Sequence, residues 1–501
     1  MSFRFAPLAS AMAVSILAFV AIGVMAPVAA CAAAPAPAGD KPFDPLADKV
    51  APPPQPIAVP ADLDAKLSGL SPEQVAFLRS GKSRRIVDPE LMFRRFREMT
   101  PQQITAYVEA LESVQAQIDF KPGRDKAAIA LDSSAPDFNA WKVVRPAILN
   151  PKREPGPIAL SRYVGGWGTG FATFADAPVA LTLEDLRAGK VEVAIVGAPL
   201  DMGSGFRDAK EGPAALRTAM GAQAPWGLDM YSMIDPTKDL RIADYGDIAI
   251  DNLSTDRSVA HVREEVAAIA RTGAIPIVVG GDHSLEYPDV AAMADVYGKG
   301  KIGVVHFDSH YDAGSDRVHL IDHGQPVYRV IHEGHVLGRN YVQVGLRARI
   351  PDAPTFKWMR NEGMRYHTMV DVEKRGWEAV MNDAVAEARE GTDKLWISFD
   401  IDSLDPAFMP GTGTPVPGGL TMREAQPIVR RLCAENNIVG MDLVEVAPYL
   451  DTSYKTALNS DFLINACLSG IAMRKKGLTK PHWLSPLSSS YKGALGPDGV
   501  R

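Results

Sequence analysis

The chain is short of cysteine, of excess charge and of long runs of like-charged residues, and each shortage excludes a class of protein. Three cysteines among 501 residues, with no Cys-x-x-Cys motif, predict no disulfide framework. A formal net charge of -7 disfavours a nucleic-acid partner held by bulk positive charge. What is present is ordinary for a large globular protein, with 46% hydrophobic and 23% charged residues.

Two of the three cysteines lie in the body of the chain. Cys433 and Cys467 each fall among apolar residues of a predicted helix. Free cysteine behaves as a small hydrophobic residue in such surroundings. We therefore expect two buried thiols without a chemical role.

The first 30 residues have the layout of a secretory signal peptide. No charged residue lies between Arg4 and Asp40, residues 11–26 are apolar, and residues 27–38 are small residues and prolines. A membrane-spanning anchor is the alternative, because the apolar run approaches the ~20 residues that cross a bilayer. The small-residue exit favours cleavage. We expect an exported bacterial protein that resides in the periplasm or is held at the membrane by lipid.

The possible lipid site is Cys31. The stretch Val28-Ala29-Ala30-Cys31 resembles a bacterial lipobox, in which Cys31 would be lipidated and become the mature N-terminus. Ordinary cleavage at a nearby Ala-x-Ala site is the rival interpretation.

The remainder divides into a linker at 31–60, a mainly helical extension at 61–154, a catalytic body at 155–486 and a tail at 487–501. The linker is rich in alanine and proline, which is typical of a tether. Ser71 and Thr100 each precede a proline and have glutamine three residues on, which predicts capped helix starts. Asp88 before Pro89 predicts a third start. The extension carries no catalytic constellation, so we expect it to serve packing or oligomerisation.

The catalytic body alternates short Val/Ile-rich runs with helical stretches. The runs lie at 191–196, 275–279, 302–307, 341–344, 395–400 and 438–445. This alternation predicts an α/β fold with a mostly parallel sheet covered by helices on both faces. Ligands of such sheets bind at the carboxyl ends of the strands.

Three of these strand ends carry metal-ligand chemistry. The six candidate ligands are His283, Asp308, His310, Asp312, Asp400 and Asp402. Ligands that recur every second residue point to one side of an extended segment. Carboxylates and imidazoles without thiolate suit Mn²⁺, and Ni²⁺, Fe²⁺, Co²⁺ or Zn²⁺ also fit. Four carboxylates match the charge of two divalent ions, which together can activate one water molecule.

Each motif alone has an ordinary structural explanation. An isolated Asp-x-Asp is usually a turn or cap pair, and a single histidine is more often a core hydrogen-bonding group. Four carboxylates crowded at apolar strand ends would repel one another and lose solvation without a cation. Together the motifs therefore favour a metal centre.

The three metal motifs resemble those of the ureohydrolases, the arginase and agmatinase family. The segments are Gly280-Gly281-Asp282-His283-Ser284, Asp308-Ser309-His310-Tyr311-Asp312 and Ser398-Phe399-Asp400-Ile401-Asp402-Ser403-Leu404-Asp405-Pro406. Residues 410–419 resemble the family's glycine loop, and 322–326 and 444–448 resemble two further segments. The resemblance spans about 160–475 and implies a three-layer α/β/α sandwich, a homo-oligomer (trimer or hexamer) and hydrolysis of a guanidino group to urea and an amine. It implies two divalent ions per chain, Mn²⁺ first and Ni²⁺ second.

The resemblance also implies a role for each site residue. His283 and Asp312 would complete one metal site, His310 and Asp402 the other, and Asp308 and Asp400 would bridge both. Asp312 would also handle the proton of the attacking water. His323 would shuttle protons, and Glu445 would accept guanidinium N–H bonds. No role follows for the other nearby histidines, His306, His319, His332 and His335.

The substrate tail is the open part of the prediction. Arginases follow the second metal motif with a loop rich in Asn and Ser/Thr, and residues 313–319 lack that pattern. Arginine is therefore disfavoured, and agmatine, guanidinobutyrate, a guanidino acid or free guanidine remain. Residues 165–171 either line the pocket or form a glycine-rich turn. A formimino or amidine hydrolase, and an exported metal- or guanidinium-binding protein without turnover, are the alternative functions.

Overall fold

The computed structural model describes residues 56–119, 146–149, 153–160, 170–223, 229–315 and 320–485. The predicted signal peptide, Cys31, most of the linker, residues 165–169, His319 and the tail at 487–501 lie outside these ranges.

The catalytic body is built on one sheet of eight strands, all parallel, in the order β2-β1-β3-β8-β7-β4-β5-β6. The strands are β1 (Val193–Ala198), β2 (Ile242–Asp247), β3 (Ile275–Gly280), β4 (Gly303–Phe307), β5 (Tyr341–Leu346), β6 (Arg365–Thr368), β7 (Lys394–Asp400) and β8 (Asn437–Val444). The six predicted strands are all present. The two that the sequence did not predict, β2 and β6, are the two edges of the sheet.

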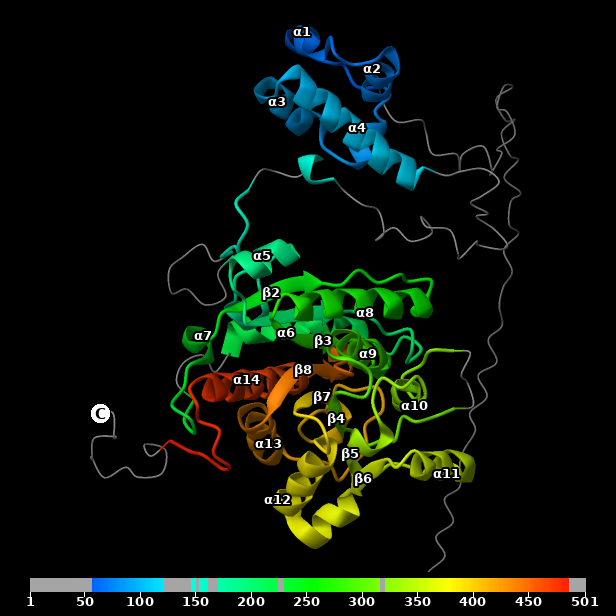
Figure 1. The fold of residues 1–501 in the computed structure, drawn as a ribbon, viewed down its shortest axis with the longest axis vertical. Helices are drawn as coiled ribbons and strands as arrows, with labels where there is room; N and C mark the ends of the chain where they lie inside the picture. Colours follow the sequence, from blue (N-terminus) through cyan, green and yellow to red (C-terminus); the bar gives the residue numbers. More distant parts are fainter. Residues whose placement is uncertain are drawn as a thin grey trace, which may run out of the picture.

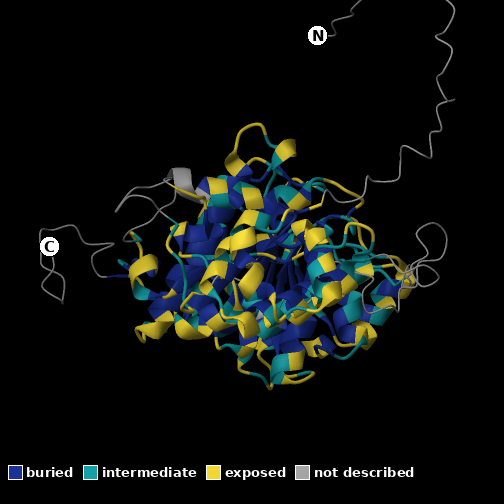
Figure 2. Cartoon of the chain, turned by 90° about the horizontal axis from the view of Figure 1, so that it is seen from above, coloured by how far each residue is buried: buried dark blue, intermediate teal, exposed yellow. Residues whose placement is uncertain are grey.

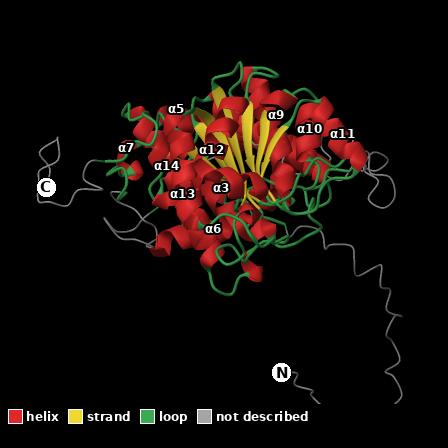
Figure 3. Ribbon diagram, turned by 90° about the horizontal axis from the view of Figure 1, so that it is seen from below, coloured by secondary structure: helices red, strands yellow, loops and turns green. Residues whose placement is uncertain are grey.

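Helices cover both faces of the sheet and complete a three-layer sandwich, as predicted (Figure 3). One face packs against α6 (Gly212–Gln223), α12 (Met369–Ala388), α13 (Met422–Glu435) and α14 (Lys455–Lys475). The other face packs against α5 (Leu183–Ala188), α8 (Thr255–Arg271), α9 (Glu286–Tyr297), α10 (Pro326–His332) and α11 (Ala353–Asn361).

Alternating side chains along each strand feed these two cores. Val193 and Ile195 of β1 belong to the first core, and Ala194 and Val196 belong to the second. This is the two-residue period of an extended chain. Figure 2 shows the result, with buried residues concentrated around the sheet and exposed residues on the outer faces of the helices.

The N-terminal extension is a helical unit with a core of its own (Figure 1). It contains α1 (Asp64–Leu67), α2 (Pro72–Arg79), α3 (Pro89–Glu98) and α4 (Pro101–Ile118). The predicted caps are present: Ser71 and Thr100 form capping boxes, and the Asp88 side chain accepts from the Leu91 N–H. Phe96 and Tyr107 pack edge to face at its centre with ring centroids 5.5 Å apart.

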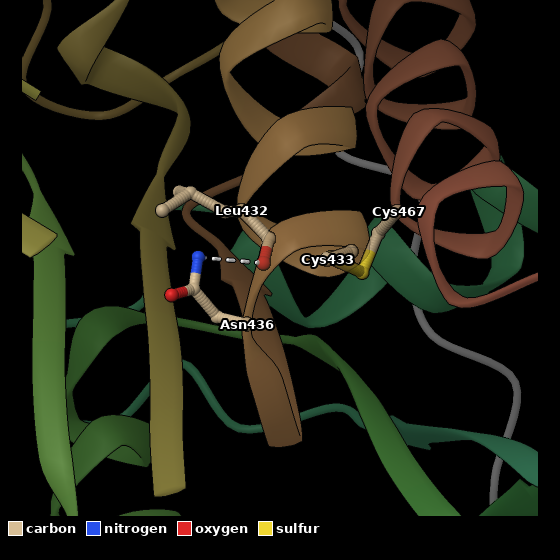
Figure 4. The surroundings of a disulfide bond; sticks show 4 residues. All are labelled: Leu432, Cys433, Asn436 and Cys467. Atoms are coloured by element: carbon tan, nitrogen blue, oxygen red, sulfur yellow. Dashed lines mark hydrogen bonds between the residues drawn. A yellow bond between two sulfur atoms is a disulfide. The ribbon is translucent and has the colours of Figure 1, made fainter. Parts of the chain in front are cut away.

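Cys433 and Cys467 form a disulfide, so the expectation of two free thiols was wrong (Figure 4). The bond joins α13 to α14, and the two Cα atoms lie 5.3 Å apart. The reason is the close approach of the two helices. A Cβ atom at Gly470 would collide with the Arg430 carbonyl oxygen and lie 2.7 Å from Cys433 Cβ, so only glycine allows this packing. Sequence spacing alone does not reveal such a contact.

No helix among the described residues is both long and apolar enough to cross a membrane.

Candidate metal centre

The carboxyl ends of four neighbouring strands, β3, β8, β7 and β4, carry the candidate site. After β3 the chain turns sharply at Gly281, whose φ of +49° is one that side chains rarely adopt. A Cβ atom there would lie 2.5 Å from the Ala198 carbonyl oxygen and 2.6 Å from that of Leu200. Gly281 therefore lets His283 follow the strand immediately and face the sheet edge.

His283 lies at the centre of a first cluster of ligands. Its Nδ1 atom is 3.2 Å from Asp308 Oδ2, 3.4 Å from Asp312 Oδ2 and 3.1 Å from Asp400 Oδ2. Asp308 follows β4, and Asp400 ends β7. Asp312 has a φ of +38°, a strained backbone conformation of the kind that functional sites retain.

His310 forms a second cluster that shares Asp308 with the first. Its Nδ1 atom lies 2.9 Å from Asp402 Oδ2 and 3.4 Å from Asp308 Oδ1. The two clusters thus use different oxygens of Asp308. The structure places all six residues predicted as ligands at this one edge of the sheet.

The hydrogen bonds behind His283 test whether this donor set fits a cation. Ser398 Oγ donates to Asp442 Oδ1 at 2.8 Å, so it must accept from His283 Nε2–H at 3.0 Å. In neutral His283 the proton is then on Nε2, and Nδ1 carries a lone pair. Buried Nδ1 has no hydrogen-bond partner among the described residues, yet three carboxylate oxygens converge on it. Lone pairs that converge in this way fit a metal ion.

Electrostatics lead to the same conclusion. Burial and the neighbouring Asp402 and Asp308 raise the pKa of Asp400 well above its usual range. Burial and Asp308 raise the pKa of Asp402 to about 6 and also raise that of Asp312. Burial would raise the pKa of Asp308 too, but the surrounding imidazoles hold it well below its ordinary value. Divalent cations would relieve this repulsion and keep the carboxylates ionised.

His306, to which the sequence assigned no role, is a buried neighbour of Asp308. Its Nε2 lies 3.1 Å from Asp308 Oδ2, and its Nδ1 lies 3.1 Å from Glu286 Oε2 and 2.8 Å from the Tyr341 hydroxyl. That hydroxyl donates to Glu286 Oε1. The His306 ring stacks on the His283 ring with centroids 4.9 Å apart. The available signal was its position two residues before Asp308, on the same face of β4.

Arg347 is a second residue that the sequence analysis missed. Its guanidinium donates to the backbone carbonyl oxygens of Asp402 at 2.7 Å, Ser403 at 3.1 Å and Leu404 at 3.1 Å. It also donates to carbonyls of the glycine loop, at Val416 and Pro417. Thr414 of this loop donates to Asp402 Oδ2 at 3.2 Å. Arg347 therefore fixes the loop against the turn that carries Asp402.

Glu445 and His323 lie together beside the first cluster. Glu445 Oε1 accepts from the His283 N–H at 2.9 Å and lies 3.0 Å from His323 Nδ1. Glu445 is only 1% exposed and has a φ of +67°, so it is not a surface residue at the end of a strand. Its Oε2 is buried without a hydrogen-bond partner among the described residues. Burial lowers the pKa of His323, but the neighbouring Glu445 raises it, and the net effect is a rise to about 9.

A cavity of about 1050 Å³ opens on this side of the site. His323 and Tyr311 line it, together with Ser204 and Arg207 of the loop after β1. The other nearby histidines in the described part lie elsewhere: His332 stacks on Tyr328, and His335 contacts Glu333.

The sequence model of the arginase family matches residues 191–468. The chain belongs to the arginase family. It is therefore an enzyme, a metal-dependent hydrolase of the ureohydrolase type. A guanidinobutyrase of Pseudomonas aeruginosa is 36% identical over 58% of this chain and 88% of its own length. An agmatinase of Chromobacterium violaceum is 38% identical over 57% of this chain and 85% of its own length.

Two solved structures agree with the sequence match. A hypothetical agmatinase from Burkholderia thailandensis superimposes with a TM-score of 0.56 at 31% identity, and the match covers 65% of this chain and 100% of the other. A proclavaminate amidino hydrolase from Streptomyces clavuligerus superimposes with a TM-score of 0.54 at 27% identity, covering 61% and 98%. The arginase-family fold is thus shared over the catalytic body.

Proposed function

We propose that this enzyme hydrolyses the guanidino C–N bond of a small cationic guanidino compound, giving urea and an amine or ammonia. The observation that carries the proposal is Glu445. One of its oxygens is held by His283 N–H and His323, and the other is buried and has no hydrogen-bond partner in the described part of the chain. A buried carboxylate oxygen of this kind suits a cationic N–H donor such as guanidinium.

The ligand set supports a centre of two divalent ions, with Mn²⁺ first and Ni²⁺ second. His283, Asp308, Asp312 and Asp400 would hold one ion, and His310, Asp308, Asp400 and Asp402 the other. When bound, the ions would supply Lewis acidity and activate a water molecule at neutral pH.

The side chains around the centre would do the rest of the chemistry. Glu445 would fix the guanidinium carbon in the path of the attacking water, because its Oε1 is held by the His283 N–H and by His323 next to the first ligand cluster. Asp312 would receive a proton from that water. The departing nitrogen needs a proton to leave, and His323, which lines the cavity and whose pKa is raised by Glu445, would supply it.

The relatives support the choice of substrate class. They include a guanidinobutyrase, agmatinases and a human mitochondrial guanidino acid hydrolase, which is 33% identical over 68% of this chain. We therefore place agmatine, guanidinobutyrate and other guanidino acids first among the candidates, with free guanidine after them.

A urea-release screen of guanidino compounds tests the proposal. Full-length protein loaded with Mn²⁺, and separately with Ni²⁺, is offered agmatine, 4-guanidinobutyrate, guanidine and arginine. We expect urea from one of the first three and much less from arginine. Ammonia from a formimino or amidine compound, without urea from any guanidino compound, would replace guanidino hydrolysis with the alternative reaction. No product from either class would favour a binding protein.

We further propose that the protein is exported and assembles as a homo-oligomer, a trimer or hexamer. The disulfide between Cys433 and Cys467 supports export, because structural disulfides persist in oxidising compartments such as the bacterial periplasm. A lipid at Cys31 would be its only tie to the membrane.

A further inference from the structure

Gln325 is a buried polar side chain in the wall of the cavity that also contains His323. Gln325 is only 2% exposed, and neither Oε1 nor Nε2 of its side chain has a hydrogen-bond partner among the described residues. Its backbone is well fixed. The Gln325 N–H donates to the Asp322 carbonyl oxygen at 3.3 Å, and its carbonyl oxygen accepts from the Arg329 N–H at 3.2 Å.

Among the described residues, the other buried glutamines each pair their amide nitrogen, although their Oε1 atoms have no partner. The Gln343 amide donates to the Tyr311 carbonyl oxygen at 2.8 Å, and the Gln115 amide donates to Asp119 Oδ1 at 2.5 Å. Burying an amide without partners is costly, and native proteins rarely leave both its donor and its acceptor unpaired. An unpaired carboxamide in the wall of a cavity is therefore arranged to meet a ligand.

The position of Gln325 indicates which part of the ligand it meets. His323 lies two residues earlier and contacts Glu445, which the proposed function assigns to the guanidinium. Gln325 and His323 both line the cavity, whereas neither Glu445 nor any of the six metal ligands is among its lining residues. The cavity would therefore hold the part of the substrate that extends past His323, and Gln325 would meet that part. A carboxamide donates to a carboxylate through its NH₂ group and accepts from an ammonium through its oxygen.

We propose that the Gln325 carboxamide binds the polar tail of the substrate, the end remote from the guanidino group. This inference rests on the proposed function and narrows it. The substrate is a guanidino compound with a terminal hydrogen-bonding group, a carboxylate or an ammonium, rather than free guanidine.

Steady-state kinetics on the metal-loaded full chain test this assignment. Gln325→Met keeps the length and volume of the side chain but removes both polar atoms. We expect KM for the preferred substrate with a polar tail to rise roughly three- to tenfold, because one hydrogen bond is lost. The kcat and the metal content should stay unchanged. Turnover of free guanidine, where measurable, should keep its KM. Gln325→Asn, which keeps the amide, should recover part of the loss.

A second variant identifies the tail. Gln325→Glu accepts but does not donate in its ionised form, so it should favour agmatine and penalise 4-guanidinobutyrate. The reverse preference, or an equal effect on both, would contradict the contact. The assignment is also overturned if wild type releases urea only from free guanidine, or if Gln325→Met leaves KM for tailed substrates unchanged. Absence of urea from wild type on every compound would instead refute the proposed function itself.

Thermal unfolding and metal analysis of each variant separate this role from a structural one. If the loss of activity in a variant is accompanied by loss of metal or by a lower unfolding temperature, Gln325 is a structural residue and the assignment is overturned. Binding of the reaction products, putrescine and 4-aminobutyrate, gives a readout independent of turnover. Gln325→Met should weaken the tighter of the two by a similar factor.

Discussion

At the residue scale, the site separates the side chains that converge on a cation position from one buried carboxylate, Glu445, that lies beside them. Glu445→Gln tests this division because it keeps the shape of the side chain and removes its charge. A charge-assisted hydrogen bond to a cation contributes about 1.5–3 kcal/mol. Turnover should therefore fall by at least about tenfold. Metal analysis should give the wild-type content.

The matched comparison is Asp402→Asn, an equally conservative change at a candidate ligand. It should lower both the metal content and the activity. If Glu445→Gln lost its metal together with its activity, Glu445 would be a ligand or a support for His283 rather than a substrate contact.

His306 is expected to act on the metal centre through Asp308. His306→Phe keeps an aromatic ring to stack on His283 but removes the nitrogens that contact Asp308 and Glu286. Loss of a partner that orients a ligand typically costs about 10–100-fold in metal affinity. Competition with a chelator measures this change. Tyr341→Phe, which removes only a hydroxyl, should have a smaller effect. Unchanged affinity in His306→Phe would contradict this role.

The sequence predicted part of this site for a clear reason. The candidate ligands recur every second residue directly after apolar strands, so local spacing predicts that they point to one place. The partners of His306 come from α9 and β5, and Arg347 acts through backbone carbonyls. The unpaired amide of Gln325 becomes visible only when the cavity is known. Contacts of these kinds depend on tertiary packing and leave no local pattern.

At the scale of elements, the same reasoning explains which strands could be predicted. The six central strands are buried on both faces and consist largely of apolar residues. The edge strands β2 and β6 are only partly buried, and their sequences are more polar. Edge strands commonly carry polar residues that prevent further pairing. Hydrophobic periodicity therefore misses them.

The disulfide between α13 and α14 is expected to stabilise the fold. It closes a loop across a sequence separation of 34 residues. A cross-link of this span contributes typically about 2–4 kcal/mol. The double variant Cys433→Ser, Cys467→Ser should unfold at a temperature lower by several degrees. Thiol titration of denatured, unreduced wild type should find neither Cys433 nor Cys467 free, so that only Cys31, where it is retained without lipid, reacts. Two free thiols, or a variant as stable as wild type, would contradict this expectation.

Asp461 of α14 makes the stability of the body depend on pH. Its carboxylate oxygens are buried without a hydrogen-bond partner in the part of the chain that the structure describes, and burial raises its pKa from 3.8 to about 8. Between these values the unfolded chain has released a proton that the folded chain retains. Asp461 therefore lowers stability progressively as the pH rises from about 4 to about 8.

Asp461→Asn removes this titration. Melting temperatures measured from pH 4 to pH 9 should fall less steeply with rising pH in the variant than in wild type. The variant should be the more stable protein at pH 8. Parallel profiles would show that Asp461 is ionised, or that it has a partner, in the folded protein.

At the scale of the whole molecule, one edge of the sheet holds both the candidate metal ligands and the carboxylate that we propose binds the substrate. Parallel strands bring four carboxyl ends together, so a single edge gathers the six candidate ligands and Glu445. The described part of the helical extension carries its own core, and none of its residues belongs to that cluster. The chemistry therefore belongs to the catalytic body, and the extension remains available for the assembly that we propose.

The most direct test of the central claim is a metal titration followed by urea release. Metal-free full-length protein receives Mn²⁺ in steps while urea from 4-guanidinobutyrate and from agmatine is measured. The account predicts no urea without metal and a rise that reaches its plateau at about two ions per chain. Full turnover without added metal, or no urea from either compound at any metal loading, would contradict it.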